Sequence, residues 1–254
     1  MTPEKFRDIE KLYHYTSFKN GMFILQSQTM IMSKPIKMND INENNRFISC
    51  DNEKNDIGMV MNEMERYFQS SFTRDDGKIP GFAIAAMWGH YAENGKGMCL
   101  VFDKRKLLSR IKDEEFFKDK VTYEKDFDSS ICVEGNPKEY IQNNTKEVFF
   151  TKSDDWSYER EFRVVRRSLS SSVEIDLTGC IIAVIVHDFV DTPSDGCVYN
   201  APSYINLVNR VRPLKIPVLV FSKDSISGPY SIIEGENGGR DWLIDDYEGL
   251  ILDI

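Results

Sequence analysis

The sequence predicts an α+β fold, with a mostly antiparallel β core flanked by helices. Short strand-like and helix-like segments follow one another irregularly, without the strand–helix–strand repeat that parallel sheets require. Hydrophobic residues make up 41% of the 254 residues, which is enough for a sizeable core. No composition break marks a boundary, so we expect a single domain over residues 1–254 that ends in an acidic segment, 223–254.

The first 32 residues predict a strand, a helix and a second strand. Residues 11–15 (KLYHY) are rich in aromatics, which favours a strand. Thr16 and Ser17 then provide an N-cap for a helix over residues 18–26. Residues 29–32 (TMIM) read as the second strand, which Pro35 ends.

A longer helix is predicted at residues 56–69, because its apolar residues recur at helical spacing. Its Met-rich stripe indicates core packing rather than a cofactor contact. Residues 82–87 and 97–102 are apolar runs on either side of a turn at Asn94-Gly95, and are expected to form either a hairpin-like pair or a strand, turn and strand around a cleft. Further strands are predicted at 121–123, 160–165, 173–176, 180–187 and 218–221, and further helices at 104–111, 138–150 and 203–211. Asp103 is the predicted N-cap of the helix at 104–111.

Charge is distributed unevenly along the chain. The net charge is −9, and residues 223–254 hold eight acids and two bases, a net of −6, which leaves −3 for the rest. An acidic balance argues against non-specific nucleic-acid binding, but mainly for this segment. A local basic groove stays open as an alternative to solvated charges on a strand face, with candidates Lys152, Arg160, Arg163, Arg166 and Arg167.

The cysteines and histidines give no metal-binding pattern. The five cysteines include no CxxC pair, and the three histidines have no zinc-ligand spacing. We therefore expect free thiols, a cytoplasmic location and no bound metal. The first residues lack the apolar run of a signal peptide, and the apolar stretches are far shorter than a membrane span, so no membrane contact is expected.

Three segments concentrate polar and aromatic groups: 12–17 (LYHYTS), 87–92 (MWGHYA) and 155–165 (DWSYEREFRVV). Each alone is typical of a core strand. Glu159 and Glu161 give a sharper signal, because two residues of separation at the start of a strand predicts that both carboxylates share one face with Arg163. This pattern suits a carboxylate that stabilises a cationic sugar transition state, and it also suits a surface ladder of Glu and Arg pairs.

These segments, in this order, resemble the bacterial domain-of-unknown-function 2971 family. The resemblance rests on LYHYTS (12–17), SKPIKMND (33–40), WGHYA (88–92) and WSYEREFR (156–163), and spans roughly residues 11–190. Four ordered motifs over most of the chain are more specific than any one of them. This family name implies no function.

A more distant resemblance does imply one. Residues 13–31 are similar to the opening of the ADP-ribosyltransferase fold, and Glu159-Arg160-Glu161 is similar to the ExE element of such enzymes. The resemblance implies an ADP-ribosyltransferase-like domain in which His14 and Thr16 hold the ribose of NAD. It further implies that Tyr91 packs against nicotinamide and that Glu161 is the catalytic carboxylate.

Neighbouring residues complete the implied NAD site. Tyr15, Trp88 and His90 are alternatives for the aromatic role, Glu159 is the other carboxylate of the ExE element, and Arg46 is a candidate for the pyrophosphate. The implied function is an NAD-dependent transferase, a toxin or anti-phage effector with an RNA, DNA or protein acceptor and an antitoxin or chaperone partner. Residues 209–215 (NRVRPLK) favour nucleic acid weakly.

Two other classes of function stay open. One is a binding module that senses a nucleotide without turning it over. The other is a nuclease or hydrolase that uses His14, His90 and the Glu pair as general acid and base.

Overall fold

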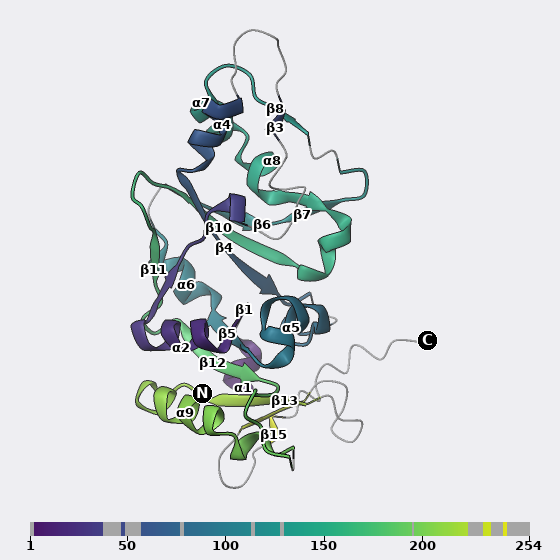
Figure 1. Ribbon diagram of the computed structural model, residues 1–254, viewed down its shortest axis with the longest axis vertical. Coiled ribbons are helices and arrows are strands. Elements are labelled where there is room, and N and C mark those ends of the chain that lie inside the picture. Colours follow the sequence, from purple (N-terminus) through teal and green to yellow (C-terminus); the bar gives the residue numbers. More distant parts are fainter. Residues whose placement is uncertain are drawn as a thin grey trace. The chain divides into compact units, whose positions relative to one another are not determined.

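The computed structural model describes residues 3–37, 47–48, 57–76, 79–112, 115–127, 130–194, 196–222, 231–234 and 241–242. The chain forms two compact units. Unit 1 comprises residues 1–29, 72–110 and 176–254, and unit 2 comprises residues 30–71 and 111–175. The prediction of a single domain stays a prediction. Figure 1 shows the ribbon and labels most of its helices and strands.

Unit 1 is built on a sheet in the order β15-β14-β13-β12-β5-β1-β4. All neighbouring pairs with a described register are antiparallel except β12 with β13, which is parallel. The strands are β1 (Lys11–Thr16), β4 (Tyr67–Arg74), β5 (Met98–Asp103), β12 (Ile181–Val186), β13 (Val218–Ser222), β14 (Ser231–Glu234) and β15 (Asp241–Trp242). The strands β1, β5 and β12 are almost wholly buried, which places the core of unit 1 around them.

Helices surround this sheet. They are α1 (Pro3–Asp8), α2 (Phe18–Ser27), α5 (Ala85–Tyr91), α6 (Lys104–Arg110) and α9 (Pro202–Val211), with 3₁₀ turns η2 (Glu93–Gly95), η4 (Val198–Asn200) and η5 (Arg212–Leu214). The predicted caps are confirmed for two of them. The Ser17 hydroxyl accepts from the Asn20 N–H at the start of α2, and the Asp103 carboxylate accepts from the Lys106 N–H at the start of α6.

Unit 2 contains the other end of β4, followed in sheet order by β10 (Glu161–Arg167) and β6 (Phe116–Lys120), which is antiparallel to β10. Smaller pairings join β3 (Phe47–Ile48) to β8 (Ile131–Cys132) and β7 (Thr122–Glu124) to β9 (Thr151–Ser153), both parallel, and join β2 (Thr29–Ile31) to β11 (Glu174–Asp176). The helices are α4 (Ile57–Met64), α7 (Pro137–Asn143) and α8 (Thr145–Phe150), with η1 (Pro35–Lys37) and η3 (Asp154–Glu159).

The α+β prediction with a mostly antiparallel core is therefore confirmed. Val60 and Met64 of the Met-rich stripe lie in the core of unit 2, as predicted, beside Tyr67, Phe149 and Val165. Within the described residues no helix is both long and apolar enough to cross a membrane. Cys99, Cys180 and Cys197 are free, whereas Cys132 is disulfide-bonded, so the expectation of free thiols is wrong for Cys132.

Three element predictions are wrong. The helix predicted over residues 56–69 ends at Met64, and Tyr67 and Phe68 begin β4, because the β-favouring run YFQSSFT buries both faces of that strand. Residues 85–91 form the helix α5 rather than a strand before the Asn94-Gly95 turn. The helix predicted over 138–150 is two helices, since Asn144 leaves the helical conformation at φ −116°.

Candidate active site

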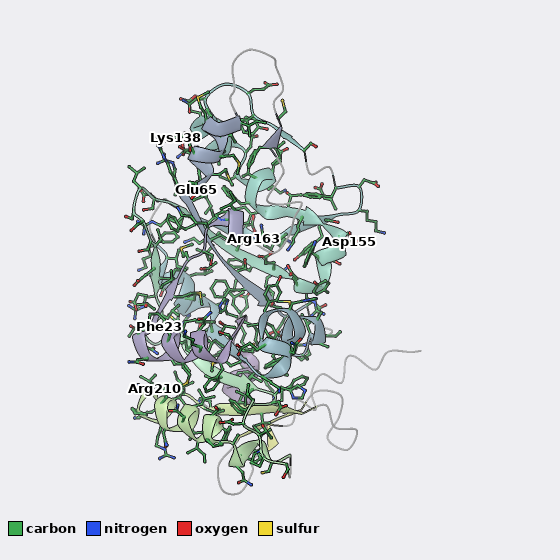
Figure 2. All side chains as sticks on the ribbon, viewed as in Figure 1. Phe23, Glu65, Lys138, Asp155, Arg163 and Arg210 are labelled. Carbon is green, nitrogen blue, oxygen red and sulfur yellow. The ribbon has the colours of Figure 1, made fainter. Side chains whose placement is uncertain are left out.

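Four buried charged side chains form a cluster in unit 2. Lys152, Glu159, Glu161 and Arg163 are exposed by 4%, 3%, 5% and 2%. The Lys152 Nζ donates to Glu159 Oε2 at 2.8 Å and lies 4.0 Å from Glu161 Oε2. The Arg163 Nε and Nη2 donate to the two carboxylate oxygens of Glu161, each at 2.8 Å. We call these four residues the buried charge cluster; Figure 2 labels Arg163 within it.

The cluster is assembled by a short stretch of chain. Lys152 lies on β9, Glu159 is the last residue of η3, and Glu161 and Arg163 lie on β10. Between the two acids, Arg160 takes a left-handed conformation at φ 48° that ends η3 and starts β10. Strand alternation was the predicted reason for the proximity of Glu159 and Glu161. This reason is wrong, since only Glu161 is on the strand. Glu159 comes to the same lysine through the turn, not through strand alternation.

The positive charge of Arg163 balances the buried negative charge of Glu161, as we predicted from its position two residues further along the chain. Its remaining nitrogen, Nη1, donates to the main-chain oxygen of Phe149 on α8 at 2.7 Å. Burial raises the pKa of Glu161, but the charge and hydrogen bonds of Arg163, the charge of Lys152 and a hydrogen bond from Ser71 outweigh it. The pKa of Glu161 is therefore lowered, and the carboxylate is ionised inside the protein.

Tyrosine and tryptophan rings border the cluster. The Glu161 N–H donates to Tyr123 Oη at 2.8 Å, and burial raises the pKa of the Tyr123 phenol. The Lys152 Nζ lies 4.3 Å from the centre of the Trp156 ring, a cation–π contact from η3. Trp156 and Tyr158 are half-buried, with ring centres 6.1 Å apart. Nothing in the sequence distinguished Lys152 from the other basic residues, and nothing in it marked Tyr123 or Ser71 as part of the site.

Four of the five candidates for the basic groove that the sequence left open are paired with carboxylates. Lys152 and Arg163 are buried in ion pairs with carboxylates. Arg166 pairs with Glu115 at 3.2 Å, and Arg167 pairs with Glu63 at 2.6 Å. The arginines of β10 are thus paired with acids, but these pairs are not a surface ladder across strands, because Glu161 is buried on the same strand and Glu63 lies on α4.

Two of the aromatic candidates in unit 1 are core residues. The Tyr15 hydroxyl donates to the Gly81 oxygen and the Trp88 Nε1 donates to the Phe82 oxygen, both at 2.7 Å. The rings of Tyr15 and Trp88 are both buried and meet edge to face at 5.2 Å. Trp88 also stacks on Phe221. Main-chain oxygens thus satisfy the polar atom of each buried ring.

Three of the four remaining candidates of unit 1, His14, His90 and Tyr91, are nearer to solvent. His14 is half-buried on β1, with its ring 5.8 Å from that of Phe72. Thr16, at the end of the same strand, is buried. On α5, His90 is exposed and Tyr91 half-buried, and their rings lie 6.2 Å apart.

The predicted site residues are divided between the two units. His14, Tyr15, Thr16, Trp88, His90 and Tyr91 all belong to unit 1, and Glu159 and Glu161 belong to unit 2. Arg46 lies outside the described residues. Among the described residues, no group of three or more His, Cys, Asp or Glu side chains could hold a metal ion.

A strained turn connects α5 to β5 in unit 1. Glu93, Asn94 and Gly95 all have positive φ, at 51°, 55° and 90°. The turn places the Glu93 Oε2 where it accepts from the Phe18 N–H at 2.9 Å, at the start of α2. Gly97 follows, and a Cβ there would lie 2.3 Å from the Thr16 oxygen. The motif WGHYAENGKG therefore fixes the end of β1 against the start of β5.

Comparison with known proteins supports the first resemblance. The family described as "Protein of unknown function (DUF2971)" matches residues 87–164. The match includes the WGHYA and WSYEREFR segments, so the resemblance is confirmed over this part of the chain. No curated protein matches the chain significantly. Among solved structures, DarT of Thermus sp. 2.9 in complex with NAD+ is similar over 84% of this chain and 96% of its own, with 9% identity and a TM-score of 0.37.

Proposed function

We propose that the protein transfers ADP-ribose from NAD to an acceptor and that Glu161 stabilises the transition state. The observation that carries this proposal is the carboxylate of Glu161, buried yet ionised and oriented by two hydrogen bonds from Arg163. Breaking the nicotinamide–ribose bond builds positive charge on the ribose. An ionised carboxylate that is already fixed in place stabilises this charge without reorganising when the reaction occurs.

The reaction balances without a metal or a redox partner. Nicotinamide leaves with the electron pair of its bond to ribose C1′, and its ring becomes neutral. An oxygen or nitrogen of the acceptor forms the new bond to C1′ and loses its proton. With water as the acceptor, the products are nicotinamide and ADP-ribose, which makes nicotinamide release a readout that needs no known acceptor.

In this proposal His14 and Thr16 hold the NAD ribose and Tyr91 packs against nicotinamide, with His90 as the alternative ring. Tyr15 and Trp88 are less suited to that role, because their polar atoms are bonded to main-chain oxygens in the core. Glu159 supports the lysine beside Glu161, and Arg46 binds the pyrophosphate.

The proposal extends to the biological setting. We propose a cytoplasmic toxin or anti-phage effector that modifies RNA, DNA or protein and that an antitoxin or chaperone partner holds in check.

A second candidate is a module that binds NAD or a related nucleotide without turnover. It is favoured by the same pair of hydrogen bonds, because Arg163 occupies both oxygens of Glu161 at 2.8 Å. A carboxylate so fully paired is also what a structural ion pair requires. Measuring binding and turnover on one preparation separates the two candidates.

The experiment incubates purified protein with NAD and measures free nicotinamide by chromatography. The wild-type protein is expected to release nicotinamide, and Glu161→Gln is expected to lower the rate about 100-fold or more. Glu63→Gln is the matched control, since Glu63 is also a buried unit 2 glutamate paired with arginines, namely Arg66 and Arg167.

The outcomes distinguish the three classes of function. Loss of release in Glu161→Gln but not in Glu63→Gln, with both proteins folded, supports catalysis. NAD binding without release supports the sensor module. If neither substitution changes nicotinamide release, the assignment of Glu161 is overturned. A nucleic-acid-cleaving activity that a chelator abolishes indicates a metal-dependent nuclease instead.

A further inference from the structure

Tyr123 is a half-buried tyrosine of unit 2 whose hydroxyl adjoins the buried charge cluster. It lies on β7, which follows β6 along the chain (Figure 1) and pairs with β9, so that Tyr123 is opposite Lys152. Paired residues of neighbouring strands share one face of the sheet. The Val121 N–H donates to the main-chain oxygen of Glu161 at 2.9 Å, and the Glu161 N–H donates to Tyr123 Oη at 2.8 Å. Strand register and hydrogen bonding thus both place Tyr123 at the cluster.

The Tyr123 hydroxyl is a hydrogen-bond donor that the described part of the chain does not use. Its oxygen accepts the Glu161 N–H, but none of the described residues accepts its proton. Burial and the charges of Glu161 and Glu159 raise the pKa of the phenol, so the hydroxyl stays protonated at neutral pH. A hydroxyl that accepts one hydrogen bond donates the next more strongly, because bonds in a chain polarise one another. Tyr123 is therefore suited to donate to a ligand.

The carboxylate of Glu161 has room for one more donor. A carboxylate offers about four acceptor positions, two on each oxygen. Arg163 uses one position on each oxygen, and a hydrogen bond from Ser71 uses a third. Lys152 Nζ lies 4.0 Å from Oε2, which is beyond hydrogen-bonding distance. Among the described residues no other group donates to this carboxylate, so one acceptor position remains for a ligand.

A donor next to an acceptor matches two neighbouring hydroxyl groups of a sugar. The oxygen of one hydroxyl accepts from the phenol, and the other hydroxyl donates its proton to the carboxylate. A phosphate is a poor match, because its negative charge would lie beside the carboxylates of Glu159 and Glu161. A flat apolar ligand would leave both the phenol and the carboxylate without a new partner.

We propose that Tyr123 binds the sugar of the substrate, by donating a hydrogen bond to one hydroxyl of a vicinal diol whose other hydroxyl donates to Glu161. This contact rests on the proposed function, in which the diol is that of the ribose that bears nicotinamide. Tyr123 then selects ribose against a deoxy sugar. A missing hydroxyl would leave either the phenol or the carboxylate without its partner.

The experiment compares NAD with two analogues whose nicotinamide ribose lacks the 2′-hydroxyl or the 3′-hydroxyl. Nicotinamide release gives kcat/KM for each substrate with the wild-type protein and with Tyr123→Phe. The ratio between the two proteins cancels the intrinsic reactivity of each substrate. This ratio should be about tenfold or more for NAD, and near one for the analogue that lacks the hydroxyl contacted by Tyr123. A purely structural role of Tyr123 gives the same ratio for all three substrates, and that result would overturn the inference.

Tyr140→Phe is the matched control, because Tyr140 is another half-buried tyrosine of unit 2, on α7. It is expected to leave all three rates unchanged. Thermal unfolding shows whether Tyr123→Phe is folded, since the substitution also removes the acceptor of the Glu161 N–H. If that variant does not fold, calorimetry of the three ligands with the wild-type protein decides. Loss of either hydroxyl should weaken binding about tenfold or more, and equal affinities would overturn the inference.

The proposed function and the Tyr123 contact fail in different ways. A wild-type protein that neither binds nor cleaves NAD overturns both. Binding of NAD without release overturns the transfer reaction, and the same ratios, taken from dissociation constants, then support or overturn the contact. Nicotinamide release from NAD that is equal in wild type and Tyr123→Phe overturns the contact alone.

Discussion

Arg163 donates hydrogen bonds from Nε and Nη2 to the two oxygens of Glu161, each at 2.8 Å, with both side chains buried. Removing one member of such a pair leaves the other as an unpaired charge in the interior. We therefore expect Arg163→Met to lower the free energy of unfolding by about 3–5 kcal/mol, measured by chemical denaturation.

The matched control for that substitution is Arg166→Met on the same strand, whose partner Glu115 is exposed. Arg166→Met should lower the free energy of unfolding by no more than about 1 kcal/mol. The double variant Glu161→Gln/Arg163→Met should recover part of the loss, because no unpaired charge remains. Equal losses for Arg163→Met and Arg166→Met would contradict the structural importance of the buried pair.

Stability should depend on pH through Glu161. Burial raises its pKa, but Arg163 and Lys152 hold the folded-state pKa below the ordinary value of 4.5. The stabilisation from this carboxylate is therefore complete above pH 4.5 and is lost as the pH falls through the lower folded-state pKa. The difference in melting temperature between wild type and Glu161→Gln should shrink over this acidic range, and a difference that stays constant from pH 7 to pH 3 would refute the prediction.

Two glycines close to each other in sequence should respond oppositely to alanine. A Cβ on Gly97 would meet the Thr16 oxygen at 2.3 Å, so Gly97→Ala should lower the free energy of unfolding by about 1–3 kcal/mol. A Cβ on Gly89, exposed on α5, meets nothing within 4 Å. Gly89→Ala should stabilise by about 0.5–1 kcal/mol, because alanine favours a helix. Thermal unfolding of both variants checks the pair, and the same sign for both would contradict it.

Substitutions at Trp88 and Tyr91 should distinguish a structural role from a role in binding NAD. Trp88→Phe removes the hydrogen bond to the Phe82 oxygen and should lower the free energy of unfolding by about 1–3 kcal/mol, with the KM for NAD unchanged. Tyr91→Ala should raise that KM about tenfold and Tyr91→Phe should restore it, since the ring supplies the contact. If Trp88→Phe alone raises the KM, the aromatic role belongs to Trp88.

Much of the fold could be predicted because periodicity and capping act over short distances. Ser17 and Asp103 cap the helices that follow them, and α9 and β13 lie within a residue of their predicted positions. The failures came where tertiary packing overrides local pattern. Tyr67 and Phe68 continue a helical spacing, yet both enter β4, whose buried faces accept aromatic side chains from either side.

The candidate site was predictable only in part. Glu161 and its partner Arg163 follow from strand alternation. Lys152 could not be distinguished, because η3 brings Glu159 back to it and the left-handed conformation of Arg160 then places Glu161 nearby. A non-glycine residue in that conformation leaves no local sequence signal. Tyr15 and Trp88 looked like ligand-facing aromatics, but their main-chain hydrogen bonds depend on the distant oxygens of Gly81 and Phe82.

The buried charge cluster also has a consequence for strand pairing. In the native register Phe162 lies opposite Lys120 and Arg163 opposite Asp119. If β10 slipped by one residue against β6, each side chain would turn to the opposite side of the sheet. Glu161 and Arg163 would then leave Lys152 and the Phe149 oxygen, and apolar side chains would take their places. The buried charge cluster thus fixes the register of β10. A shifted strand would be destabilised even where the apolar residues alone would tolerate the shift.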